Sequence, residues 1–287
     1  MRRFSVLRKS LRDQKWQIFG FGMALALMAA LDLFIWPAYR DQLQNFEMPA
    51  ALEGFLGGLS ISTPAGFLTS EYFSWIPILL IVYAVIQGTA AIAGEESSGT
   101  IDLLLAQPVS RQLMVTEKAA AAVIGSVLIV AFGVAGFAVA LPLVDIDISF
   151  AHIAVACANI LPITLLFFAI SLWLGAVAPN RALASAVVIG LATAFYFMSM
   201  LASAVSSLGW LNYATPFYYY SDGPPLAEGI VWWHVGLLIG VALLFFAATL
   251  RSFTTRDVAT GGATDVDLST MLRRIAGLSA KDLGAET

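Results

Sequence analysis

Residues 150–178 read FAHIAVACANILPITLLFFAISLWLGAVA, a stretch without a single aspartate, glutamate, lysine or arginine. A helix needs about 20 mainly apolar residues to cross the hydrocarbon layer of a bilayer, and this stretch is longer than that. Because an isolated strand cannot satisfy its backbone hydrogen bonds in lipid, we expect a membrane-spanning helix. The surplus length and Pro162 predict that this helix tilts or kinks.

Five further apolar blocks of similar kind occur along the chain. Hydrophobic residues make up 59% of the 287 residues and charged residues only 12%, with a mean hydropathy of +0.83. A soluble domain carries about a quarter charged residues, so this composition excludes a soluble single-domain enzyme, and it equally excludes a disordered chain. The sequence therefore predicts an all-α integral membrane protein with six transmembrane helices, at about 18–36, 73–93, 119–141, 150–178, 182–205 and 230–250.

The positive charges indicate the orientation of these spans. If the six spans alternate in direction, every lysine and arginine except Arg40 falls on the side that holds both termini. Positively charged loops stay in the cytoplasm, so both termini are predicted to be cytoplasmic. An odd number of spans would separate the two basic ends, and the asymmetry thus supports an even count.

The segments outside the spans also contain residue patterns that predict structure. Phe4, Leu7 and Leu11 recur at helical spacing among basic residues, which predicts an N-terminal interfacial amphipathic helix; a plain basic topology signal is compatible with the same pattern. We expect a six-span membrane domain over residues 1–256. The polar remainder, residues 257–287, is expected to be a cytoplasmic tail with a short amphipathic helix.

Two outer segments contain helix starts marked by proline. Met48-Pro49 and Thr63-Pro64 each resemble the beginning of a short helix, with proline at its first position. The aromatic segment 210–220 is typical of an interfacial belt, and Pro216 leaves open an outer gate or a short re-entrant helix there.

Sequence motifs for covalent chemistry are missing. The chain has no Gly-x-x-x-x-Gly-Lys-Ser/Thr phosphate loop, no His-Glu-x-x-His and no Gly-x-Ser-x-Gly, so we predict no enzyme, catalytic residue, cofactor or metal site. Asp32 is the one acid within a predicted span. It is either a boundary residue near the outer end or a pathway or ion site.

The segment between the second and third spans stands out. Residues 94–111 read GEESSGTIDLLLAQPVSR. Thr100 can cap a short helix that has Asp102 in its first turn, and Pro108 ends that helix. A short capped helix with an apolar face suits docking into a groove of a soluble partner, although a turn lying on the membrane would read similarly.

From Glu95 to Lys118 the sequence resembles the signature of permease subunits of type-2 ABC exporters. That signature is Glu-Glu-x-x-Gly-Thr-(Ile/Leu)-(Asp/Glu)-x-Leu-Leu-x-x-Pro-(Val/Ile)-(Ser/Thr)-Arg, followed by lysine at the start of the next span. Residues 215–219, TPFYY, are similar to a Ser-Pro-Phe-x-Tyr stretch before the last span of such permeases. The resemblance covers most of the chain but excludes the tail beyond about Arg256.

The resemblance implies a six-span half-transporter in a bacterial-type inner membrane. Two permease subunits, this chain with a second copy or a related chain, would form the pathway, and two separate ATPase subunits would bind ATP and magnesium. The N-terminal helix would correspond to the connecting helix of the family. The coupling segment would comprise Glu95, Glu96, Gly99, Thr100, Asp102, Leu104, Pro108 and Arg111.

Two other functions remain compatible with the residues. One is an ion-coupled secondary transporter that uses Asp32 as its ion site. The other is a non-transporting membrane scaffold or signalling subunit that keeps the docking segment. The apolar and aromatic spans are compatible with drugs, peptides, lipids or a glycan carrier as substrate.

Overall fold

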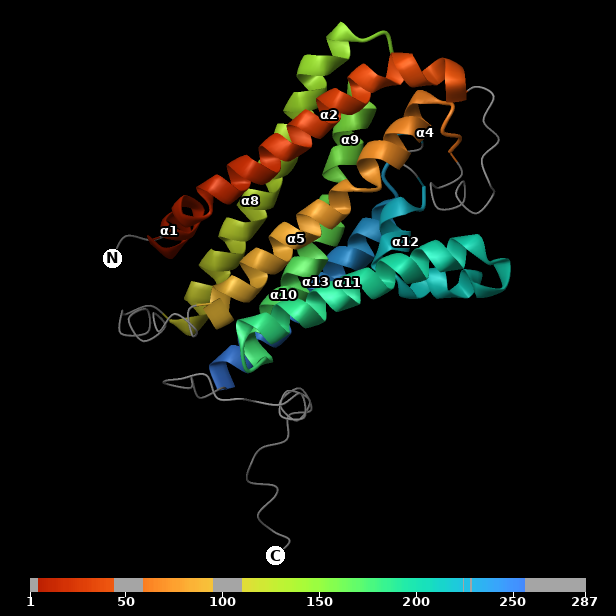
Figure 1. Cartoon of the computed structure of the whole chain (residues 1–287). Coiled ribbons are helices and arrows are strands. Elements are labelled where there is room, and N and C mark those ends of the chain that lie inside the picture. Colours follow the sequence, from red (N-terminus) through yellow and green to blue (C-terminus); the bar gives the residue numbers. More distant parts are fainter. Residues whose placement is uncertain (1–4, 44–58, 95–109, 224, 228, 256–287) are drawn as a thin grey trace, which may run out of the picture.

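The computed structural model describes residues 5–43, 59–94, 110–223, 225–227 and 229–255, and within these ranges the chain forms helices and no strand (Figure 1). Six helices or helix combinations are long and apolar enough to cross a membrane, which confirms the six predicted spans. They are Lys15–Arg40, Pro64–Gly94, Gln112–Leu143, Phe150–Val177, Arg181–Ala204 and Trp232–Ser252.

The N-terminal segment is helical, as its spacing predicts. Helix α1 (Ser5–Asp13) is followed by the long helix α2 (Lys15–Leu43), and the two are separated at Gln14. Val6 on α1 is buried, whereas Arg8 and Lys9 are exposed. Helix α1 therefore presents an apolar face to the protein and its charges outward.

The second and third spans are longer than the apolar blocks that predict them. The second is built from α4 (Pro64–Leu68), the π-helix η1 (Thr69–Phe73), α5 (Ile76–Thr89) and the π-helix η2 (Ala90–Gly94). The third is built from α8 (Arg111–Ala140) and the short 3₁₀-helix η3 (Leu141–Leu143).

Capping residues explain the extra length. Thr63 accepts a hydrogen bond from the Gly66 amide at 3.1 Å, so a helix starts at Pro64 as predicted. Helix α8 continues through the polar residues Gln112 and Glu117, which an apolar count leaves out. The predicted start at Met48-Pro49 and the predicted tail helix lie outside the described residues.

The fourth span is kinked at the place that Pro162 predicts. Helix α9 (Phe150–Ala158) ends before α10 (Leu161–Val177) begins, because Pro162 has no amide hydrogen to continue the helical ladder. The Asn159 side chain lies at the break and donates to the Tyr220 carbonyl oxygen at 3.2 Å.

The aromatic segment lies between the last two spans along the chain. They are α11 (Arg181–Ala204) and α13 (Trp232–Thr255), and between them lie the 3₁₀-helix η4 (Ser206–Ala214) and α12 (Pro216–Ser221). Thr215 caps α12 by accepting from the Tyr218 amide at 3.2 Å. A short helix therefore begins at Pro216, where the sequence left several alternatives open beside an interfacial belt.

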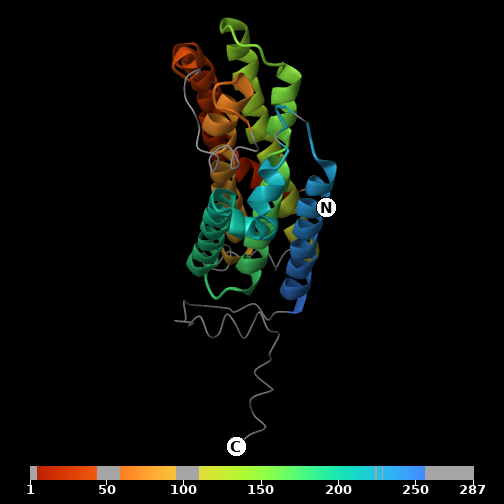
Figure 2. The ribbon, with the colours of Figure 1, turned by 90° about the vertical axis from the view of Figure 1, so that its right-hand side faces the viewer.

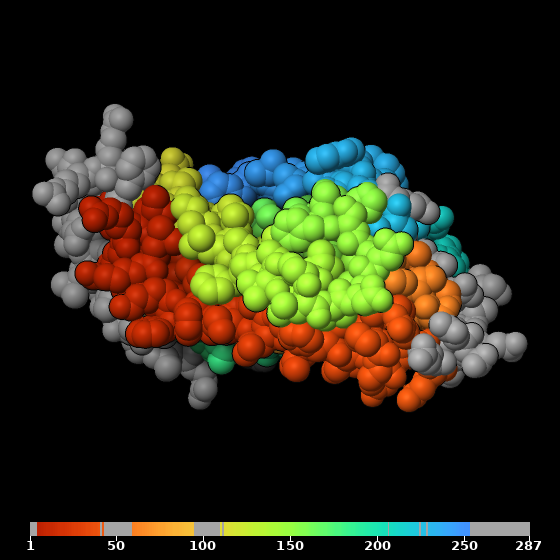
Figure 3. Space-filling view, turned by 90° about the horizontal axis from the view of Figure 1, so that it is seen from above, coloured from red at the N-terminus to blue at the C-terminus, as the bar shows by residue number. Residues whose placement is uncertain are grey.

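Helix α10 is the centre of the bundle. It packs against α5, α11 and α13, and Figure 2 shows α11 and α13 on opposite sides of it. The pair α2 and α8 forms the other part of the bundle. Figure 3 shows these two helices lying side by side, with α9 continuing the same face.

Both ends of the described chain lie at the same end of the bundle. Helix α1, η2, the start of α8, the turn between α10 and α11 and the end of α13 gather there (Figure 1). This arrangement agrees with the even number of spans inferred from the basic residues.

Two glycines let helices approach closely. A Cβ atom at Gly88 of α5 would lie 2.5 Å from the Ser171 Cβ and 2.9 Å from the Phe168 carbonyl oxygen, both on α10. A Cβ atom at Gly136 of α8 would lie 2.5 Å from the Ala26 carbonyl oxygen of α2. Small residues at such contacts allow van der Waals packing between helices in lipid.

The variant Gly88→Ala should lower the stability of the bundle by about 1–3 kcal/mol, because the added methyl group overlaps backbone atoms of α10 that cannot move aside easily. Thermal unfolding of the purified protein in detergent measures this loss. Gly190→Ala on α11 is the matched control, since a Cβ atom there meets nothing within 4 Å. Equal melting temperatures for the two variants would contradict the packing argument.

Candidate functional site

Most residues of the predicted coupling segment lie outside the described part of the chain. Arg111 is the first residue of α8, but the structure does not describe its side chain. The predicted residues outside the described ranges are Glu95, Glu96, Gly99, Thr100, Asp102, Leu104 and Pro108. The helices on either side of the segment are described, and their geometry defines the candidate site.

The segment connects η2 to α8, and the structure describes the ends of both helices. Helix η2 ends the second span at Gly94, and Ser110 caps α8 by accepting from the Leu113 amide at 3.2 Å. The Lys118 ammonium of α8 donates to the Ala91 carbonyl oxygen of η2 at 2.8 Å. A cation on the last turn of a helix is also favoured by the helix dipole. The two ends of the segment are therefore held together.

The turn between the fourth and fifth spans is bound to the same helix end. The Arg181 guanidinium donates to the Ile86 carbonyl oxygen at 3.3 Å and to the Thr89 hydroxyl oxygen at 3.5 Å. Ser185 on α11 also donates to the Thr89 hydroxyl oxygen at 3.2 Å, while that hydroxyl donates to the Val85 carbonyl at 2.7 Å. Thr89 is fully buried, so these bonds satisfy a group that has no access to water.

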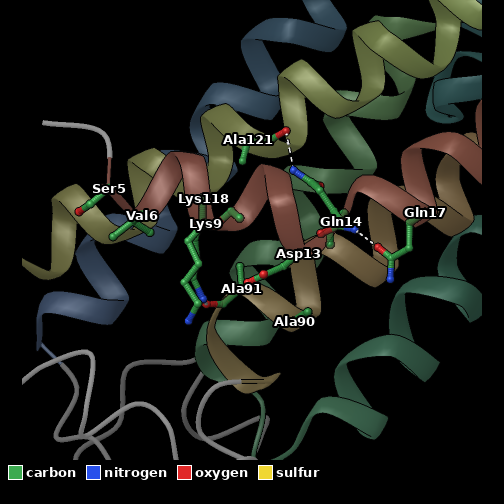
Figure 4. A pocket seen from close by; sticks show the side chains of 12 residues that line it. Ser5, Val6, Lys9, Asp13, Gln14, Gln17, Ala90, Ala91, Lys118 and Ala121 are labelled. Atoms are coloured by element: carbon green, nitrogen blue, oxygen red, sulfur yellow. Dashed lines mark hydrogen bonds between the residues drawn. The ribbon is translucent and has the colours of Figure 1, made fainter. Parts of the chain in front are cut away.

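Helix α1 is tied to α8 and α5. The Leu7 amide donates to a Glu117 carboxylate oxygen at 2.9 Å. Gln14, at the break between α1 and α2, donates to the Ala121 carbonyl at 2.9 Å and accepts from the Tyr83 hydroxyl at 2.8 Å. Figure 4 shows the Gln14 side chain pointing at Ala121. Gln14 is 4% exposed and Glu117 is 8% exposed, so both are buried polar groups with partners.

We call these residues the polar anchor. It connects four segments at one end of the bundle: α1, the second span, the start of α8 and the start of α11. Its members are Leu7, Gln14, Tyr83, Ile86, Thr89, Ala91, Glu117, Lys118, Ala121, Arg181 and Ser185. Gln14, Tyr83 and Glu117 were not predicted as site residues; the only sequence signal was a polar residue at the edge of an apolar block.

Asp32 lies apart from the polar anchor, on α2. It is 9% exposed, and its Oδ2 atom is buried with no hydrogen-bond partner among the described residues. Among the described residues there is also no group of three or more His, Cys, Asp and Glu that could hold a metal ion.

An apolar groove runs between α5 and α11, with a volume of about 250 Å³. A smaller cavity of about 40 Å³ next to α12 shares Tyr196 and Phe217 with it. We call the larger cavity the α5–α11 groove. Its lining residues are apolar or aromatic, and two of them, Thr193 and Tyr196, carry a hydroxyl: Ile78, Ile81, Val82, Val85, Ile189, Ala192, Thr193, Tyr196, Phe197 and Phe217.

Tyr220 lines the smaller cavity. Burial raises the pKa of its hydroxyl well above the usual range, so the hydroxyl stays protonated and donates to the Phe73 carbonyl oxygen at 2.8 Å. The Tyr220 carbonyl in turn accepts from Asn159 at the α9–α10 break. Tyr220 therefore holds α12 against the second and fourth spans.

Removal of the Gln14 side chain should destabilise the bundle. In Gln14→Ala the Tyr83 hydroxyl and the Ala121 carbonyl lose their partner in a buried place, and such a loss costs about 1–3 kcal/mol. A lower melting temperature in detergent is the expected result. Gln112→Ala removes an exposed glutamine from the first turn of α8 and should leave the melting temperature unchanged. A Gln14 variant as stable as this control would refute the structural role of the bridge.

Comparison with known proteins gives one family. The model of the ABC-2 family transporter protein matches residues 7–258, which covers all six spans and the polar anchor. A search of curated proteins found no match. The matched region includes the predicted coupling segment and the TPFYY stretch, and it ends near the place where the sequence resemblance ends. A multi-pass membrane chain matched over this length belongs to the ABC-2 family of transporter proteins.

Proposed function

We propose that this chain is the membrane-spanning subunit of an ATP-driven exporter and that it couples to a separate ATPase through residues 95–111. The observation that carries the proposal is the polar anchor, which joins both ends of this segment to α1 and α11. The sequence holds no phosphate-binding loop, so the partner would bind ATP and magnesium. The chain itself would hold no cofactor and catalyse no covalent step.

The polar anchor suits the transmission of a displacement. A displacement of the segment would act on η2 and on the start of α8 together, because the hydrogen bond from Lys118 to Ala91 joins these two helices. Arg181 extends the connection to α11 through Ile86 and Thr89. A displacement of the segment would then move α5 and α11 together with α8.

The α5–α11 groove is the route that this movement would change. Both of its walls are helices that the polar anchor holds, and its lining favours an apolar or amphipathic substrate. Helix α11 also exposes large apolar residues, among them Ile189, Phe197 and Leu201. In a half-transporter a second copy or a related permease would face such a surface, and we propose that assembly for this chain.

The coupling proposal predicts a stoichiometric partner. Affinity purification of the tagged chain from its native membranes in mild detergent should recover an ATPase subunit, identified by mass spectrometry, together with ATP turnover. The triple variant Gly99→Ala, Thr100→Ala, Pro108→Ala should retain roughly tenfold less ATPase, which corresponds to a loss of about 1.4 kcal/mol of binding free energy.

Gln112→Ala is the control for this experiment, because it alters an exposed residue next to the segment but not in the signature. It should insert in the membrane to the same level and keep the ATPase. Absence of any ATPase from the wild-type preparation, under conditions that keep other complexes intact, would contradict the proposal, as would full retention by the triple variant.

A second candidate function rests on Asp32. A buried carboxyl group with one unpartnered oxygen is the kind of group that ion-coupled transporters use inside a membrane. Under the exporter proposal, Asp32→Asn keeps ATP-dependent transport in vesicles within about twofold, since the group is not in the polar anchor. Transport that survives ATP depletion, stops with an ionophore and is lost in Asp32→Asn would instead establish ion coupling.

A further inference from the structure

A cavity of about 400 Å³ lies beside the polar anchor, between α1, the end of the second span and the start of α8. Figure 4 shows side chains from all three segments around it. A volume of this size is typical of pockets that bind small molecules or headgroups. The polar residues that line it are Ser5, Lys9, Ser10, Asp13, Gln14, Gln17, Gln87 and Lys118.

The charges of the cavity favour a monoanion. Among the described lining residues, Lys9 and Lys118 are cationic and Asp13 is anionic, so these three side chains carry a net charge of +1. Figure 4 shows the Lys9 side chain extended toward Ala91, whose carbonyl oxygen accepts from Lys118. The two cationic side chains therefore come from different helices and meet at one end of the cavity.

The lining also matches hydroxyl groups of a ligand. The Asp13 carboxylate can accept from hydroxyls, and the Ser10 hydroxyl and Gln17 amide can both donate and accept. A ligand with one phosphate diester and neighbouring hydroxyls would thus find complementary groups at both ends. A quaternary ammonium headgroup carries no hydroxyl and adds a positive charge to a site that already has an excess.

The cavity lies at the depth of a membrane interface. The Lys15 ammonium lies 5.4 Å from the centre of the Trp16 ring, and Trp16 is 72% exposed, as expected for an aromatic residue at headgroup level. Phe19, one turn further along α2, is 50% exposed and would lie in the acyl region. The Gln87 side chain of α5 donates to the Gln17 side chain of α2, and both residues line the cavity.

We propose that this cavity binds the headgroup of an anionic glycerophospholipid with headgroup hydroxyls, of the phosphatidylglycerol type, from the leaflet on the α1 side. Lys9 and Lys118 hold the phosphate, and Asp13 with Ser10 holds the hydroxyls. The acyl chains leave past the exposed rings of Trp16 and Phe19. Basic pockets between spans are known places for anionic headgroups.

The bound lipid would connect α1 to α8, the helix that follows residues 95–109, because Lys9 belongs to α1 and Lys118 to α8. It would strengthen the contact that Gln14 and Glu117 already make. This site is independent of the proposed ATPase coupling, and it can be tested on the purified chain alone.

The test compares lipids on the full-length chain in detergent micelles. Native mass spectrometry and thermal unfolding are measured with added phosphatidylglycerol, phosphatidylcholine or inorganic phosphate. We expect phosphatidylglycerol alone to remain bound and to raise the melting temperature. An equal effect of phosphatidylcholine would overturn the headgroup assignment, and an equal effect of inorganic phosphate would show a free-anion site instead.

Lys9→Gln should weaken phosphatidylglycerol binding about fivefold, which corresponds to about 1 kcal/mol. Arg12→Gln is the matched control, because it removes the same charge from an exposed position of the same helix outside the cavity lining. Its binding should stay within about twofold of the wild type. An equal loss in both variants would mean general attraction of α1 to anionic lipid and would overturn the cavity as the site. Both variants change exposed residues, so folding is not at risk.

Discussion

A buried carbonyl oxygen that leaves the regular helical ladder must find a donor within the protein, because lipid offers none. The bundle meets this constraint with side chains from neighbouring helices. Lys118 donates to Ala91 at the π-helical end of the second span. Arg181 is a second donor to the Ile86 carbonyl oxygen one turn earlier, which also accepts from the Ala90 amide. Asn159 donates to the Tyr220 carbonyl oxygen at the other end of the bundle. Each irregular place in a span is thus also a place where helices distant in the sequence are joined.

This distribution of donors separates the bundle into regions with different properties. Polar connections gather at the α1 end, where α5 and α10 also pack closely at Gly88, next to Thr89 of the polar anchor. The α5–α11 groove lies between the polar anchor and Tyr220, and its walls carry few polar groups. Firmly joined ends and an apolar middle are physically suited to a pathway whose shape changes when one end is displaced.

The chain belongs to the ABC-2 family of transporter proteins, so the arrangement can be interpreted in terms of transport. The same residues that satisfy buried backbone groups also fix the geometry from which residues 95–109 start and to which they return. The headgroup cavity is next to these residues, so membrane composition and a soluble partner would act on one region of the protein. Under the proposed coupling, a loss of the Lys118 or Gln14 contacts would lower both the stability of the bundle and the transmission of movement from the segment.

The sequence alone determined the six spans, the kink before Pro162, the short helix at Pro64 and the family resemblance between Glu95 and Lys118, whereas the helix at Pro216 was one of several alternatives. These features depend on local composition and on capping or proline chemistry, which adjacent residues specify. The partners of Gln14, Glu117 and Arg181 could not be predicted, because those contacts join residues far apart in the chain. Only the tertiary structure decided that α1, the second span, α8 and α11 meet at one end, since helix packing and not local sequence sets which polar side chain reaches which carbonyl oxygen.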